Sequence, residues 1–209
     1  MWHTPEVATV ALTSESALLF LSTSEAALVD AIAARIIPGD DRDPGAREAR
    51  AYLYIDRALD GAYKHYQEFY RRGLAATDAF ARATAGDRFV SLPPEVQDDL
   101  LRAMEADQAT GFDLPSASAF FLTIRGHVIE GVFSDPAHGG NHNCIGWKLI
   151  GYPGTQYEYT AEEMRPGADL SQKPIMTLAD LQRTIRERGP WGFNGTSGEG
   201  ATHGAGGGR

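Results

Sequence analysis

Apolar residues recur every three or four positions in several separate segments of the chain, which is the spacing of an amphipathic helix. The clearest example is residues 21–37, where Ser22 and Glu25 fit a capping box at the start and Pro38-Gly39 ends the pattern. The predicted core side of this helix consists of Leu28, Val29, Ile32 and Ile36.

Five more segments predict helices from the same kind of evidence. The first two are residues 46–59, which follow Pro44, and a segment that carries Tyr63, Tyr66 and Tyr70. The next two are residues 96–105, which Pro93-Pro94-Glu95 precedes, and residues 117–133, which Ser116 caps. The last is residues 178–188, which Thr177 caps and Gly189 ends. We interpret the tyrosine stripe as core rather than as a cofactor platform. In the last helix, Leu178, Leu181 and Ile185 are predicted to face inward.

The chain shows no alternating β pattern longer than a few residues and no internal repeat. We therefore predict a mostly α fold, an irregular bundle of about six helices with long ordered loops. The predicted organisation is an N-terminal extension at residues 1–20, a single helical domain at 21–188 that includes the loop 133–160, and a Gly-rich C-terminal tail at 189–209. Trp191 and Phe193 in this tail predict that it is held against another chain.

Composition and charge narrow the possible partners. The formal net charge of −9 and the pI near 5.1 leave no basic face for a phosphate backbone, which argues against nucleic acid as a partner. The single cysteine, Cys144, excludes an internal disulfide framework. No apolar run approaches the roughly 18 residues of a transmembrane helix, and no Lys or Arg precedes Arg35, so neither a membrane span nor a signal peptide is expected. The acidic loop 40–43 lacks the spacing of a calcium loop and is predicted to form either turn hydrogen bonds or a solvated face.

The stretch richest in chemically active residues is "FSDPAHGGNHNCIGWKLIGYPG", residues 133–154. One hypothesis is that the chain is a small metal-dependent enzyme, because this stretch holds four residues of metal-ligand type, Asp135, His138, His142 and Cys144. Two consecutive glycines between the histidines disfavour a helix there. The Glu that zinc hydrolases place after their first His is also absent.

A second hypothesis is thiol chemistry, with Cys144 as the nucleophile and His142 or His138 as the base. The apolar residues that follow Cys144 are more typical of a buried thiol than of a thiolate with a lowered pKa. The chain also contains no Gly-x-Ser-x-Gly elbow, phosphate-binding loop or dinucleotide fingerprint.

A third interpretation of the same stretch is structural. Its glycines permit positive φ angles and close chain approach, and its asparagines can bond to neighbouring backbone. Trp147, Ile150 and Tyr152 add large apolar area. This composition predicts a rigid, non-repetitive loop that either wraps its own core or is presented to a partner.

Two blocks of sequence resemble a known family when taken together and in order. They are "IIPGDDRDPGAREARAYLYIDRAL", residues 36–59, and "GVFSDPAHGGNHNCIGWKLIGYPG", residues 131–154. Both are similar to the small subunit of gluconate 2-dehydrogenase, called subunit 3 or the gamma subunit. The resemblance extends over residues 21–154.

This resemblance implies a non-catalytic subunit that holds no cofactor. Its partner would be a large flavoprotein of the glucose-methanol-choline (GMC) oxidoreductase type, which holds FAD and oxidises a sugar or sugar acid, and a multihaem cytochrome c subunit can carry the electrons onward. The small subunit would stabilise the large one and escort it to the periplasm through a twin-Arg signal. No Arg-Arg pair precedes the first predicted helix here, and the only such pair is Arg71-Arg72. Either the partner carries the signal or the complex stays in the cytoplasm.

The resemblance also makes the stretch 133–154 an ordered element that contacts the flavoprotein. Trp147 and Tyr152 would be its anchors, because buried aromatic side chains dominate interface energetics. The full set of expected partner contacts is Asp135, His138, Asn141, Trp147, Tyr152, Trp191 and Phe193. The sugar, the electron acceptor and the stoichiometry stay open, because they are determined by the partner.

Overall fold

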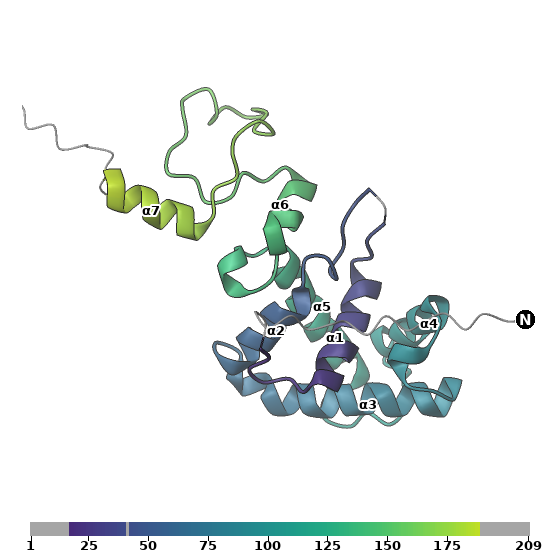
Figure 1. Ribbon diagram of the computed structural model, residues 1–209. Coiled ribbons are helices and arrows are strands. Elements are labelled where there is room, and N and C mark those ends of the chain that lie inside the picture. Colours follow the sequence, from purple (N-terminus) through teal and green to yellow (C-terminus); the bar gives the residue numbers. More distant parts are fainter. Residues whose placement is uncertain (1–16, 41, 189–209) are drawn as a thin grey trace, which may run out of the picture.

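The computed structural model describes residues 17–40 and 42–188. Within these ranges the chain contains seven α-helices, four short 3-10 helices and no β-strand, which confirms the predicted mostly α fold (Figure 1). The elements are α1 (Thr23–Ile36), α2 (Ala51–Asp60), η1 (Lys64–Tyr66), α3 (Gln67–Ala85), η2 (Phe89–Ser91), α4 (Pro94–Glu105), α5 (Ala117–Phe133), η3 (Pro136–His138), η4 (His142–Cys144), α6 (Ile145–Ile150) and α7 (Leu178–Arg188). None of the described helices is long and apolar enough to cross a membrane.

Helix α5 is the central element of the bundle and packs against α1, α2, α3 and α4. Its side chains Phe120, Ile124, Val128 and Val132 recur at helical spacing and are fully buried. Burying each side chain of this size stabilises the fold by about 1.5–3 kcal/mol. The main hydrophobic core is built from residues 21–132, so it is complete before the chemically active stretch begins.

The first helix begins and ends as the sequence predicts. The Ser22 hydroxyl oxygen accepts a hydrogen bond from the Glu25 N–H at 3.3 Å, and the Glu25 carboxylate accepts one from the Ser22 N–H at 2.9 Å. These two bonds form the capping box. In the loop after α1, the Asp40 carboxylate accepts hydrogen bonds from the N–H groups of Arg42 and Asp43 at 2.7 and 2.8 Å, so the predicted turn hydrogen bonds are confirmed.

Helix α2 starts later than predicted, at Ala51 rather than Ala46. Arg50 has a left-handed backbone conformation with a φ of 55°, which interrupts the helical path. The carbonyl of the preceding residue, Ala49, accepts a hydrogen bond from the N–H of His142 at 3.1 Å. In a longer helix the Ala49 carbonyl would accept a hydrogen bond from within the helix. Here it accepts one from His142 in a distant part of the chain instead.

The start of the folded body is held by one buried carboxylate. Asp56 on α2 is fully buried and accepts hydrogen bonds from the N–H groups of Leu19, Phe20 and Leu21 at 2.7, 3.0 and 2.7 Å. Residues 19–21 consequently belong to the packed body, next to the start of α1.

The tyrosine stripe packs against the core, with Tyr70 buried and Tyr63 and Tyr66 half-buried, although α3 begins only at Gln67 and so contains Tyr70 alone. Tyr70 on α3 is fully buried, and its hydroxyl lies 2.8 Å from Nδ1 of His127 on α5. The ring of Tyr63 stacks on the same imidazole, with ring centroids 4.5 Å apart. His127 is therefore a buried ionisable group held between two aromatic side chains.

We expect the stability of the folded chain to fall as the pH drops below about 6.5, the ordinary pKa of histidine. Burial lowers the pKa of His127, and the nearby Glu130 only partly opposes that effect. The unfolded chain then binds a proton more readily than the folded chain. The contribution of neutral His127 to the free energy of unfolding is thus fully present above the ordinary histidine pKa. It is lost as the pH falls toward the lowered pKa of His127 in the folded chain. Urea unfolding between about pH 8 and about pH 5 measures this slope.

The variant His127→Gln should show a shallower slope over the same range, because it removes one of the groups that must charge in the core. His138→Gln is the matched control, since His138 lies exposed on η3, and it should keep the slope of the natural chain. An unchanged slope in His127→Gln would contradict the assignment.

The chain after Gly154 forms an arm without a core of its own. None of the residues 155–188, here called the C-terminal arm, is buried, and α7 lies beyond α6, away from the bundle (Figure 1). The arm is fixed at its base, where the Met176 carbonyl accepts the Thr155 N–H at 2.8 Å and the Met176 N–H donates to the Pro153 carbonyl at 2.9 Å.

Helix α7 forms where the sequence predicts it, but its apolar side is only partly covered. It has no buried residue: Leu178 and Leu181 are half-buried and Ile185 is exposed, so the predicted inward side finds only partial cover in the part of the chain that the structure describes. The apolar spacing is that of a helix that packs against something else. The Gly-rich tail with Trp191 and Phe193 lies outside the described residues, as do residues 1–16.

Candidate functional site

The chemically active stretch folds into a compact loop that lies against α2 and α5. The site loop, residues 134–154, contains η3, η4 and the short helix α6, so it has more regular structure than the non-repetitive loop that the sequence predicts. Asn141, Asn143 and Cys144 all have left-handed backbone conformations, with φ angles of 45°, 56° and 57°. Asn adopts this conformation readily, whereas Cys does so only where surrounding contacts enforce it.

Asn141 is the internal brace of the site loop. Its side chain is fully buried, donates from Nδ2 to the Ser134 carbonyl at 2.8 Å and accepts at Oδ1 from the Gly146 N–H at 2.8 Å. Its own N–H donates to the Gly131 carbonyl at 2.7 Å. The polar atoms of Asn141 are thus used inside the chain, which gives it a structural role, and the expected partner contact at Asn141 stays a prediction.

Trp147 is likewise an internal residue. Its side chain is 3% exposed, its Nε1–H donates to the Phe133 carbonyl at 2.7 Å, and its ring meets that of Tyr152 edge to face. Its ring packs within its own chain, and the expected anchoring of a partner by Trp147 stays a prediction. Tyr152, at 43% exposed, keeps a free face that a partner can contact.

Two glycines allow the site loop to approach α5 closely. A β-carbon at Gly140 would collide with the carbonyl of Gly131, and one at Gly146 would collide with the carbonyl of Val132. Backbone atoms cannot move aside as a flexible side chain can. These positions therefore require glycine for packing, as the structural interpretation of the sequence proposes.

The four residues of metal-ligand type have other roles. The Asp135 carboxylate accepts the Ala137 N–H at 2.9 Å and the Leu178 N–H at 2.7 Å, so it ties the site loop to α7. His138 is exposed on the surface. Across residues 17–40 and 42–188, no group of three or more His, Cys, Asp and Glu side chains is arranged to hold a metal ion.

The electrostatics of the site loop are opposite to those of a reactive thiol. Burial raises the pKa of the Cys144 thiol, and the nearby Lys148 only partly offsets this. Burial, followed by the positive charge of Arg50, lowers the pKa of His142. A thiol whose pKa is raised and an imidazole whose pKa is lowered do not make the activated pair that thiol chemistry needs.

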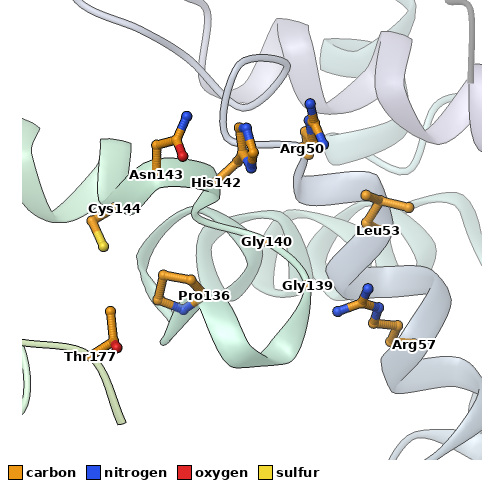
Figure 2. Close-up of a pocket in the computed structure, with 10 residues that line it drawn as sticks. All are labelled: Arg50, Leu53, Arg57, Pro136, Gly139, Gly140, His142, Asn143, Cys144 and Thr177. Atoms are coloured by element: carbon orange, nitrogen blue, oxygen red, sulfur yellow. The ribbon is translucent and has the colours of Figure 1, made fainter. Parts of the chain in front are cut away.

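A pocket of about 430 Å³ lies between α2 and the site loop (Figure 2). Its lining residues are Arg50, Leu53, Arg57, Pro136, Gly139, Gly140, His142, Asn143, Cys144 and Thr177. The sequence pattern alone does not single out the two arginines, although Arg50, Leu53 and Arg57 stand at the i, i+3 and i+7 positions that share one helix face. Arg57 lies across Gly139, where an added β-carbon would be 2.7 Å from the arginine Cδ.

Comparison with known proteins gives one finding. A family model described as gluconate 2-dehydrogenase subunit 3 matches residues 23–154, which is more than half of the 209 residues and agrees with the resemblance seen in the two sequence blocks. No curated protein and no solved structure matches significantly. The matched region contains the bundle and the site loop, and it ends where the C-terminal arm begins.

Proposed function

Because the chain belongs to the gluconate 2-dehydrogenase subunit 3 family, and is thereby a subunit of a dehydrogenase complex, we propose that it binds and stabilises a larger catalytic subunit without performing chemistry itself. The proposed partner is a GMC-type flavoprotein that oxidises a sugar or sugar acid. FAD, which accepts the hydride, belongs to that partner in this proposal. A cytochrome c subunit as the electron acceptor and a periplasmic location are further parts of it.

The observation that carries the proposal is the uncovered C-terminal arm. Of the ten large hydrophobic residues that are exposed in the described part of the chain, six lie between residues 149 and 185: Tyr159, Met164 and Ile185 in the arm, and Leu149, Ile150 and Tyr152 in the adjoining end of the site loop. A concentration of exposed apolar side chains marks a surface for association. An arm with no buried residue also gains little stability from its own contacts, so it is suited to wrap another chain.

The direct test is to purify the tagged chain gently from its native host and record the absorbance spectrum and the accompanying chains. A yellow preparation with a larger chain and dye-reducing activity on a sugar supports the proposal, and haem bands support the cytochrome. Fractionation of the cells tests the periplasmic location. A colourless single chain, stable alone, would overturn the proposed function.

A single substitution tests the role of the arm. Ile185→Glu places a charge on the apolar side of α7 and should weaken binding of the catalytic subunit by roughly 10- to 100-fold. The melting temperature of the isolated chain should stay nearly constant, because Ile185 is exposed and α7 has no fully buried residue. Titration of the purified catalytic subunit with each variant measures the affinity.

Ala179→Glu is the matched control for this substitution. Ala179 is exposed on the same helix, and at about 100° per residue it lies well away from the line through Leu178, Leu181 and Ile185. It adds the same charge, so binding should stay close to that of the natural chain. Equal losses in the two variants would mean that charge alone, not the apolar side of α7, is responsible.

A further inference from the structure

The pocket between α2 and the site loop is basic, although the chain as a whole has a net charge of −9. Its lining includes Arg50 and Arg57 and contains no Asp or Glu, while the whole chain holds 28 acidic residues. Among the residues that the structure describes, no carboxylate forms an ion pair with either arginine. Two guanidinium groups in one concave surface therefore present positive charge that the described part of the chain does not neutralise.

The arrangement of the two arginines is fixed by the fold. They lie seven residues apart on one side of the α2 segment, which corresponds to about 10 Å along a helix axis. Arg57 lies against the backbone of Gly139, and Arg50 has the left-handed conformation directly before the first residue of α2. Figure 2 shows both groups on the same wall of the pocket, opposite Pro136 and Cys144. Residues held in such uncommon conformations concentrate at functional sites.

We propose that this pocket binds carboxylate side chains from an acidic segment of the catalytic subunit. The inference rests on the proposed function, since it names a second contact surface for the same partner. Guanidinium groups bind carboxylates with two parallel hydrogen bonds, which gives both strength and orientation. Thr177, which precedes α7, lines the same pocket, so the basic pocket and the C-terminal arm form one continuous surface.

An acidic polypeptide fits the pocket better than a small molecule does. Sites for small molecules are deep enough to bury most of the ligand, whereas this pocket is a shallow hollow on the surface with Arg57 exposed on its wall. An extended segment can place one carboxylate at each arginine, because consecutive side chains on one face of a strand are about 7 Å apart and a few residues cover the distance. Charge pairs at such a surface mainly set the association rate and its salt dependence.

The test uses the complex of the chain with its catalytic subunit. Replacing both arginines, Arg50→Gln with Arg57→Gln, should weaken binding by about tenfold or more at low salt, and the difference should shrink as NaCl rises from about 0.05 to about 0.5 M. The control pair is Arg72→Gln with Arg102→Gln. It removes the same charge from residues whose ion pairs within the described part of the chain are exposed, and binding should stay within about twofold.

Modification of arginine by phenylglyoxal gives a second readout that does not depend on how the variants fold. Mass spectrometry should find Arg50 and Arg57 modified in the isolated chain and protected in the complex, while Arg72 and Arg102 react in both. Equal reactivity of Arg50 and Arg57 in the free chain and the complex would overturn the proposal and leave the proposed function intact. Protection already in the free chain would overturn it too, because a segment of this chain would then cover the pocket. Failure of the natural chain to bind any catalytic subunit would remove both.

Discussion

Replacing Asp56 with alanine should lower the free energy of unfolding by about 3–5 kcal/mol. The carboxylate is fully buried and accepts three backbone N–H groups, those of Leu19, Phe20 and Leu21. Its removal leaves these donors without a partner at the edge of the core, and each buried unsatisfied donor costs about 1–3 kcal/mol. Urea unfolding monitored by circular dichroism measures the loss.

Two related variants show whether the loss comes from the hydrogen bonds. Asp56→Asn keeps the shape and one oxygen acceptor, so it should lose less stability than Asp56→Ala. Asp60→Ala is the matched control, because Asp60 ends the same helix and is exposed, and surface changes of this kind stay within about 0.5 kcal/mol. If Asp56→Ala and Asp60→Ala unfolded at the same urea concentration, the anchoring role of Asp56 would be refuted.

The helices that the sequence predicts well are those whose signals are local. The Ser22 and Glu25 box, the Ser116 cap and the apolar spacing of α5 all act within a few residues, and the structure has each of them in place. Such signals are sufficient because a helix satisfies its backbone hydrogen bonds within its own segment. The mostly α class follows from the same local evidence.

The features that the sequence does not predict depend on partners far along the chain. Asp56 holds N–H groups 35 to 37 residues away, and nothing near it in the sequence distinguishes it from the exposed Asp60. The break at Arg50 accompanies a hydrogen bond from His142 to Ala49. Local spacing predicts an unbroken helix there, because the competing contact comes from the site loop.

The site loop also shows which structural features its composition predicts and which it does not. Its composition predicts an ordered element, and Asn141, Gly140 and Gly146 do have structural roles. Composition cannot tell which aromatic side chains are turned inward and which are left for a partner. Trp147 is inside and Tyr152 is outside, although both stand in the same apolar run. The apolar spacing of α7 predicts its helix in the same way, but not that its apolar side is only partly covered.

Replacing Trp147 with alanine should therefore reduce stability before it reduces partner binding. Truncating a large buried aromatic residue costs about 3–5 kcal/mol, and Trp147 is 3% exposed. The substitution also removes the Trp147 Nε1–H group, which donates a hydrogen bond to the Phe133 carbonyl at 2.7 Å. Thermal unfolding of the isolated chain should show a clearly lower melting temperature without any partner present.

Two comparisons separate packing from hydrogen bonding and from partner contact. Trp147→Phe keeps most of the ring but loses the N–H, so it should cost about 1–2 kcal/mol, the price of one unpaired carbonyl and a small cavity. Tyr152→Ala removes the exposed neighbour that meets the Trp147 ring edge on and should cost less than Trp147→Ala. If Trp147→Ala melted like the natural chain but failed to bind the catalytic subunit, Trp147 would be an interface anchor after all. The site loop would then have to rearrange on binding, because the Trp147 side chain is enclosed by its own chain in the structure.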